Sequence, residues 1–129
     1  MLVADFTDHV AGWRVIADPA ALDAGVWPVG SQVVRISPDD AFVIGATEPT
    51  VPADADAIVT PEFGFSMAVV HDVAALAERH IEWSLPTQRP AVAQGQIAGV
   101  PAKLVLLADG SAQLLVASAA RHELQERLS

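Results

Sequence analysis

The chain has 129 residues, of which 52% are hydrophobic, and a formal net charge of −9. This length fits one domain with a real hydrophobic core and leaves little room for two, so we expect a single domain over residues 1–129. The sequence contains no cysteine, which excludes disulfides, a thiolate nucleophile and a zinc–thiolate site.

The negative charge is concentrated in the first half of the chain. Residues 1–62 hold ten carboxylates against Arg14 and Arg35, whereas residues 63–129 hold six against five basic side chains. Nucleic-acid phosphates are bound through clustered lysine and arginine, so we expect no nucleic-acid partner. The first residues lack the basic and apolar regions of a secretory signal, and no apolar run is long enough to span a membrane. We therefore expect a cytoplasmic protein without a membrane partner.

The N-terminal third is expected to be acidic and largely irregular. Within it the sequence predicts a strand at 13–17 and a short helix at 19–24 that has proline in its first turn, and farther along the chain it predicts an acidic, proline-rich loop at 48–56. Two β-rich runs, 32–36 and 42–46, flank a separator that has turn chemistry, so they predict a hairpin.

Residues 57–60 are compatible with a short strand, and residues 63–70 predict a better one with two different faces. One face carries the bulky side chains Phe63, Phe65, Met67 and Val69, and the other carries Gly64, Ser66, Ala68 and Val70. The small face suits a closely packed helix, and the bulky row is our candidate interface with another chain.

The remainder predicts two helices and two further strands. Asp72 is expected to cap a helix that ends near Glu82, and Ser118 to cap a last helix that repeats leucine every four residues. Residues 83–96 are expected to form a long loop. Strands at 102–107 and 112–117 are joined by Ala-Asp-Gly-Ser, a strong hairpin signal.

From residue 63 onward the predicted order is strand, helix, strand, strand, helix. Together with one strand of the earlier hairpin, this order predicts an α+β fold. Its expected core is a ferredoxin-like split βαβ unit, an antiparallel sheet with helices on one face. The runs 104–107 and 114–117 are almost continuously apolar, which is typical of strands buried on both faces. The face without helices would be covered by the N-terminal segment or by a partner, of which a homodimer is the simplest.

No residue set predicts catalysis or metal binding. Ser66 lies inside a strand rather than on the strand-to-helix turn that a nucleophile elbow needs. His122 and Glu126 are four apart on a helix but lack further ligands. His80 is expected to pack or to lie at the edge of a cleft, His71-Asp72 is explained by capping, and His9 has no partner beyond nearby aspartates. The long loop offers a ligand cleft, with Trp83, Arg89 and Gln94 as its candidate residues.

Two blocks of the sequence resemble the sarcosine oxidase gamma subunit family. The first is VVRISPDDAFVIGA, beside the family segment "RxxPDEWLxxG". The second ends in GQIAGVPAKLVLLADGSAQLLVASAARHELQERL, beside "aGvpvll… dGfxllVpRSya… lwewL". The resemblance covers residues 31–128. Departures occur at 40–42 (Asp-Ala-Phe for Glu-Trp-Leu), at 60–62, and at 119–120, where Arg-Ser-Tyr is usual.

The family is related to the folate-binding domains of glycine-cleavage T-protein, and its gamma subunit carries no flavin, NAD or folate. The resemblance therefore implies a non-catalytic accessory subunit that acts in assembly of a multi-subunit oxidoreductase of amine or one-carbon metabolism. It implies no cofactor, and partners that include flavin-bearing oxidase subunits. The alternative, from a different class, is a stand-alone binder of a small folate-like ligand in the cleft near Trp83.

Overall fold

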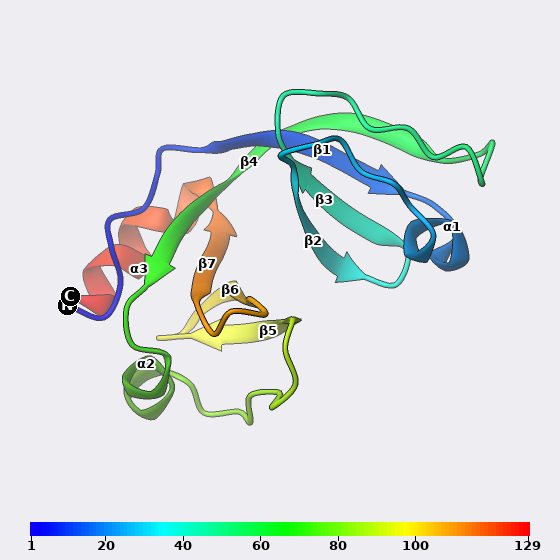
Figure 1. The fold of residues 1–129 in the computed structure, drawn as a ribbon. Coiled ribbons are helices and arrows are strands. Elements are labelled where there is room, and N and C mark those ends of the chain that lie inside the picture. Colours follow the sequence, from blue (N-terminus) through cyan, green and yellow to red (C-terminus); the bar gives the residue numbers. More distant parts are fainter. The chain divides into compact units, whose positions relative to one another are not determined.

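The computed structural model describes all residues from Met1 to Ser129 and consists mainly of β-strands (Figure 1). The elements follow in the order β1 (Val10–Ile16), α1 (Pro19–Asp23), β2 (Gln32–Ser37), β3 (Asp40–Ile44), β4 (Ile58–Val70), α2 (Val73–His80), β5 (Ala91–Ile97), β6 (Val100–Leu106), β7 (Ala112–Ala117), a 3-10 turn (Ser118–Ala120) and α3 (Arg121–Leu128).

The chain falls into two compact units, which are described separately. The central unit is Val10–Phe63, and the terminal unit combines Met1–His9 with Gly64–Ser129. The long strand β4 contributes its first residues to the central unit and the rest to the terminal unit. Whether the chain behaves as the single domain expected from its length stays a prediction.

In the central unit the strands follow one another in the order β2, β3, β1, β4. β3 pairs antiparallel with β2 on one side and with β1 on the other. Their apolar side chains meet α1 in a small core, against which Trp27 packs; the core consists of Val15, Ala17, Leu22, Ala41 and Val43. The Asp18 side chain accepts a hydrogen bond from the Ala20 amide and caps α1, which has Pro19 in its first turn.

The predicted strand near 13–17, the helix near 19–24 and the hairpin are confirmed by β1, α1 and the β2–β3 pair. The expectation of a largely irregular N-terminal third is wrong, because β1 lies between β3 and β4 rather than apart from the sheet. Gly12 is one reason why the sequence of β1 predicts a strand only weakly. A Cβ there would lie 2.5 Å from the Val43 carbonyl oxygen, so close strand packing selects glycine over a β-forming residue.

In the terminal unit the strand order is β4, β7, β6, β5, and each neighbouring pair is antiparallel. One face of these strands forms a core with Leu76 of α2 and with Leu124 and Leu128 of α3. Its strand residues include Ala68, Leu104 and Leu114, which are almost completely buried. Asp72 caps α2 as predicted, since its carboxylate accepts from the Ala75 amide at 3.0 Å.

Residues 1–9 run along β4 within the terminal unit. Val3 forms an antiparallel bridge with Val70, and the Ala4 and Thr7 amides donate to the carbonyls of Val69 and Met67. The Phe6 amide donates to Gln125 Oε1 of α3 at 2.9 Å. The segment therefore satisfies backbone groups along an edge of β4 that would otherwise be available to another strand.

The predicted ferredoxin-like split βαβ fold, with helices on one face of the sheet, is wrong. The structure has seven strands, its registered pairs are all antiparallel, and the helices are short. In a split βαβ unit a helix connects two parallel strands of the sheet. Here α2 leads from β4 to β5, and the three antiparallel pairs between them make these two strands antiparallel.

The error comes from β5, which lies in the segment predicted to be a loop. If β5 is left out, β6 becomes the strand after α2. It has the direction of β4, with β7 between them, as in a split βαβ unit. The turn after β5 is Ala98-Gly99, where both residues have positive φ, 50° and 78°. Such a two-residue turn favours glycine and closes the β5–β6 hairpin.

Two smaller features also bear on the sequence predictions. Ser118 does not cap the last helix, which begins after a 3-10 turn and has no side-chain cap. The predicted hairpin at 108–111 is confirmed, since Asp109 accepts hydrogen bonds from both the amide and the hydroxyl of Ser111. No helix is both long enough and apolar enough to cross a bilayer.

Candidate interaction surface and ligand cleft

The terminal part of β4 has the two faces that its sequence predicts. Ser66, Ala68 and Val70 are buried, whereas Val69 is 50% exposed and Phe65 and Met67 are partly exposed. Phe63, the last residue of the central unit, is 58% exposed. The bulky row is thus the accessible face of the strand, while its role as an interface stays a prediction.

The surroundings of this row combine apolar side chains with one cation. Met67 pairs in register with Leu115, which in turn pairs with Lys103, so these three side chains share a face of the sheet. The Lys103 ammonium lies 5.4 Å from the centroid of the Phe65 ring, within the range of a cation–π contact. Leu115 is completely buried, so the accessible part of this face in the terminal unit consists of Val69 together with the partly exposed Phe65, Met67 and Lys103.

Ser66 is a buried structural residue in this arrangement. Its hydroxyl is completely buried, donates to the Asp8 carbonyl at 2.7 Å and lies 2.9 Å from the Ser118 hydroxyl. A serine nucleophile would need an accessible hydroxyl beside a general base. Ser66 instead ties β4 to the N-terminal segment and to the turn before α3.

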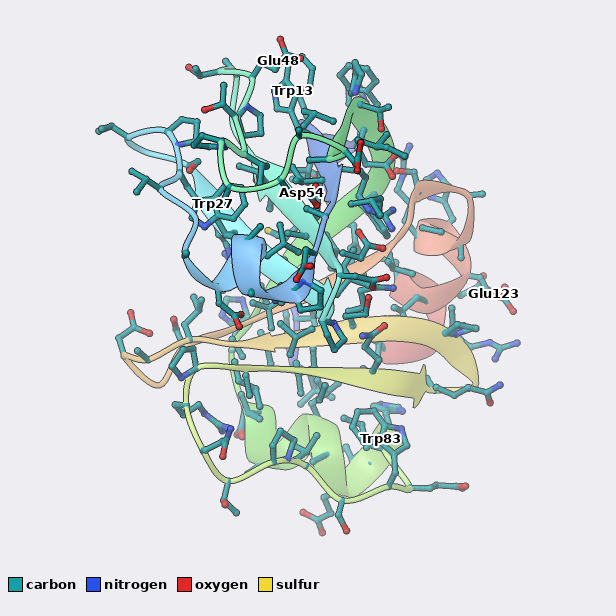
Figure 2. All side chains as sticks on the ribbon, turned by 90° about the vertical axis from the view of Figure 1, so that its right-hand side faces the viewer. Trp13, Trp27, Glu48, Asp54, Trp83 and Glu123 are labelled. Atoms are coloured by element: carbon teal, nitrogen blue, oxygen red, sulfur yellow. The ribbon has the colours of Figure 1, made fainter.

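Trp83, the first of the three cleft candidates, follows α2 and packs against β5 (Figure 2). Its indole Nε1 donates to the Gln96 carbonyl at 2.9 Å. Gly95 lies directly against the ring, since a Cβ at that position would come within 2.6 Å of the indole nitrogen. Trp83 therefore connects the segment after α2 to β5.

The other two candidates do not join Trp83. Gln94 pairs in register with Lys103, and it alternates with Gly95, so its side chain points to the face of β5 opposite Trp83. The Arg89 guanidinium donates to the carbonyls of Pro86 and Gln88 within its own loop. The predicted three-residue cleft is thus not assembled.

Trp83 does border a cavity of about 620 Å³ at the end of α2. The residues that line this cavity come from α2, the loop after it and the β5–β6 turn: Arg79, His80, Glu82, Trp83, Gln96, Ala98 and Gly99. The backbone around it is fixed, because the Ala98 amide donates to the His80 carbonyl and Arg127 donates to the Ala98 carbonyl. Sequence reasoning missed Arg79 and Gln96, because their proximity depends on the unpredicted strand β5.

No three metal-ligating side chains gather in one place. His122 and Glu126 are exposed on α3. His9, just before β1, and His71, between β4 and α2, are exposed as well. The neighbouring Glu123 forms an ion pair at 2.6 Å with Arg127 of the same helix.

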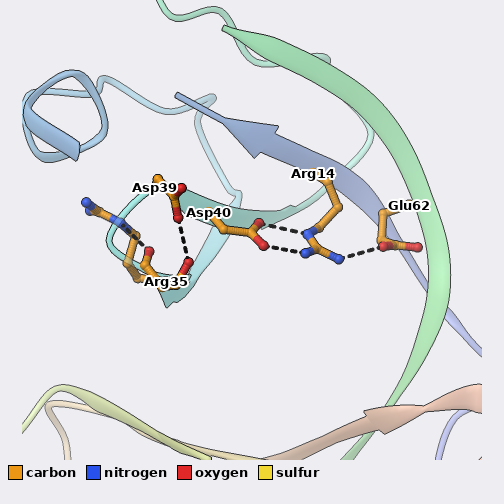
Figure 3. Close-up of polar contacts among 6 residues, drawn as sticks. Arg14, Arg35, Asp39, Asp40 and Glu62 are labelled. Carbon is orange, nitrogen blue, oxygen red and sulfur yellow. Dashed lines mark hydrogen bonds and ion pairs between the residues drawn. The ribbon is translucent and has the colours of Figure 1, made fainter. Parts of the chain in front are cut away.

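The central unit contains an ion-pair cluster that the sequence did not predict (Figure 3). Arg14 of β1 donates from Nε and Nη2 to both carboxylate oxygens of Asp40, at 2.9 and 2.5 Å, and from Nη1 to Glu62 at 3.0 Å. The hydrogen bonds to Asp40 raise the pKa of Arg14 above its ordinary value, against the opposing effect of burial. Arg14 thus pairs with both carboxylates, and the cluster joins β1, β3 and β4.

A second arginine, Arg35, stabilises the β2–β3 hairpin. The Arg35 guanidinium donates to the Pro38 carbonyl at 2.6 Å and forms an ion pair with Asp23 at 2.9 Å. Asp39 accepts from the Ser37 hydroxyl in the same turn (Figure 3). The charged residues of this segment therefore hold the turn and α1 in place.

No family model matches the chain, and no curated protein matches it. Among solved structures, the chain is similar to a chain of the heterotetrameric sarcosine oxidase from Corynebacterium sp. U-96 in complex with pyrrole 2-carboxylate. The TM-score is 0.61 at 14% sequence identity, and the likeness covers 98% of this chain and 81% of that chain. At this identity the likeness shows a shared fold, and it supports the resemblance to sarcosine oxidase at the level of the fold.

Proposed function

We propose that this chain is a non-catalytic subunit of a sarcosine-oxidase-type complex. The observation that carries the proposal is the extent of the structural likeness. Nearly the whole of this chain corresponds to four-fifths of one chain of a heterotetrameric sarcosine oxidase. The matched chain is therefore only moderately longer than this one, which favours the role of a small subunit.

The use that the structure makes of its polar side chains is consistent with an accessory role. The hydroxyl of Ser66 and the charges of Arg14 and Asp40 are engaged in contacts within their own units. A catalytic acid, base or nucleophile needs to be accessible to substrate, and these groups are instead used in structure. The proposed contribution of the chain is thus a binding surface.

The surface that we assign to this role in the terminal unit is the outward row of β4. Phe65, Met67 and Val69 alternate along one face of β4, where Val69 is half exposed and the other two are partly exposed, and the Phe65 ring lies beside Lys103. Aromatic residues and methionine are enriched in protein interfaces. Flavin-bearing oxidase subunits are the proposed partners. The alternative of a stand-alone folate-like binder has less support, because only one of its three predicted residues borders the cavity.

Light scattering after size-exclusion chromatography tests this proposal. The chain would be co-expressed with the flavin-bearing oxidase subunits of its own organism, and it should elute with them in a fixed ratio. Val69→Asp should release it, whereas Ile58→Asp, at an apolar position of similar exposure outside the row, should not. Elution of the unmodified chain apart from the flavoproteins would contradict the proposal. A homodimer of the chain alone would point to self-association as the use of this row.

A further inference from the structure

The loop between α1 and β2, residues 24–31, presents two valine side chains to solvent in the central unit. Val29 is 106% exposed and Val26 is 87% exposed, and among the large hydrophobic residues only Met1, at 92%, is comparably exposed. Single exposed apolar residues are normal on protein surfaces. Two of them on one short loop, one of which also lines an apolar groove, indicate an interaction site.

The loop holds these valines in a defined position. Trp27, between them, packs on the central-unit core and lies against Gly25, where a Cβ would come 2.6 Å from the ring. At the other end, the Ser31 amide and hydroxyl both donate to the Pro28 carbonyl, at 3.1 and 2.6 Å. Binding would therefore lose little conformational entropy from this side.

A groove of about 240 Å³ lies beside Val26. Its walls are the end of α1 and the segment 50–53, and the lining is mostly apolar: Ala21, Ala24, Gly25, Val26, Thr50, Val51, Pro52 and Ala53. The Asp54 carboxylate accepts from the Asp18 amide at 2.8 Å and so connects the two walls. The groove is large enough to receive an aliphatic side chain.

The net charge of the central unit indicates the kind of partner that the groove would bind. The central unit has two basic residues, and both are paired internally: Arg14 with Asp40 and Glu62, and Arg35 with Asp23. It carries eight carboxylates, namely Asp18, Asp23, Asp39, Asp40, Glu48, Asp54, Asp56 and Glu62. Glu48 and Asp54 are on the segment that includes one wall of the groove (Figure 2). No basic side chain of this unit is left to balance them, so a basic partner would be complementary.

We propose that this groove and the two valines bind a partner-protein segment in which an apolar side chain is flanked by lysine or arginine. The apolar side chain enters the groove beside Val26, Val29 contacts the adjoining part of the segment, and the basic side chains approach the surrounding carboxylates. The inference deepens the proposed function by naming the chemistry of a partner segment. It concerns the central unit alone and does not depend on the β4 row.

The test uses the whole chain, labelled with ¹⁵N, and three short synthetic peptides of equal length. The probe carries a central pair of leucines flanked by lysines. In one control peptide serine replaces leucine, and in the other glutamate replaces lysine. Saturable shifts of the amide resonances of Val26, Val29, Ala21 and Ala53 are expected with the probe only, and added salt should weaken them.

The matched variants separate the apolar contact from general attraction between charges. Val26→Ser/Val29→Ser keeps the net charge and should weaken binding of the probe by about tenfold, since the loop no longer offers its apolar side chains. Ile58→Ser, at another exposed position of this unit, should have no effect. Equal binding of the serine peptide, equal binding of the glutamate peptide, or the same affinity in the valine variant would each overturn the proposal. None of these outcomes bears on whether the chain joins an oxidase complex.

Discussion

The ring of Trp83 lies so close to Gly95 of β5 that a Cβ there would come within 2.5–2.9 Å of three ring atoms. The indole also donates to the carbonyl of Gln96, the next residue of the strand. These contacts connect the loop after α2 to β5, the strand that the sequence did not predict. They also give Trp83, which was predicted to line a ligand cleft, a structural role.

Gly95→Ala should therefore destabilise the terminal unit through steric overlap with Trp83. Overpacking of this kind typically costs about 1–3 kcal/mol, which urea unfolding of the two proteins would measure. The same change made in a Trp83→Leu background should be almost neutral. If Gly95→Ala costs the same in both backgrounds, the contact with Trp83 is not the reason for glycine at this position.

The pairing of Arg14 with Asp40 should contribute measurably to stability because it is bidentate and only partly exposed, with side-chain exposures of 26% and 15%. A double-mutant cycle with Arg14→Met and Asp40→Asn should give a coupling free energy of about 1 kcal/mol. Glu62 stays available to Arg14 in the Asp40→Asn protein, which limits the effect of that single change. An additive cycle, with no coupling, would show that the two charges are independent.

The free energy of unfolding should depend on pH because the pKa of Asp54 is shifted in the folded protein. The amides of Asp18 and Asp56 donate to its carboxylate and lower its pKa below the ordinary value of 3.8. A lowered folded-state pKa stabilises the protein above the unfolded-state value, and this contribution is lost as the pH falls through the folded-state pKa. Unfolding at neutral pH should thus be easier for Asp54→Asn than for the unmodified chain, and the difference should shrink below pH 3.8. A difference that does not change with pH would contradict this account.

Local sequence signals predicted local structure well in this protein. The alternation along 63–70 correctly separated the buried Ser66, Ala68 and Val70 from the more accessible row. Asp72 and the Asp-Gly turn at 109–110 have the roles that their chemistry indicates. These features depend on residues close together in the chain, which is why one sequence is enough to find them.

The features that the sequence did not reveal depend on strand register and on the neighbours of each strand. The segment 91–97 is rich in alanine, glutamine and glycine and has only two β-branched residues, Val92 and Ile97, so its strand signal is weak and its pairing with β6 decides its structure. Its omission produced both the wrong fold class and the wrong cleft, because Gln94 was placed with Trp83 although the two lie on opposite faces. The cluster of Arg14, Asp40 and Glu62 likewise needs three paired strands before it can be recognised.

Purification of the tagged chain from its native cells tests the central claim most directly. The claim predicts that flavin-bearing subunits co-purify with the chain in a constant ratio. The complex should show the absorbance of bound flavin and lose it when sarcosine is added without oxygen, whereas the separated chain should neither hold flavin nor oxidise sarcosine. Recovery of the chain alone, or sarcosine oxidation by the isolated chain, would contradict the claim that it is a non-catalytic subunit of such a complex.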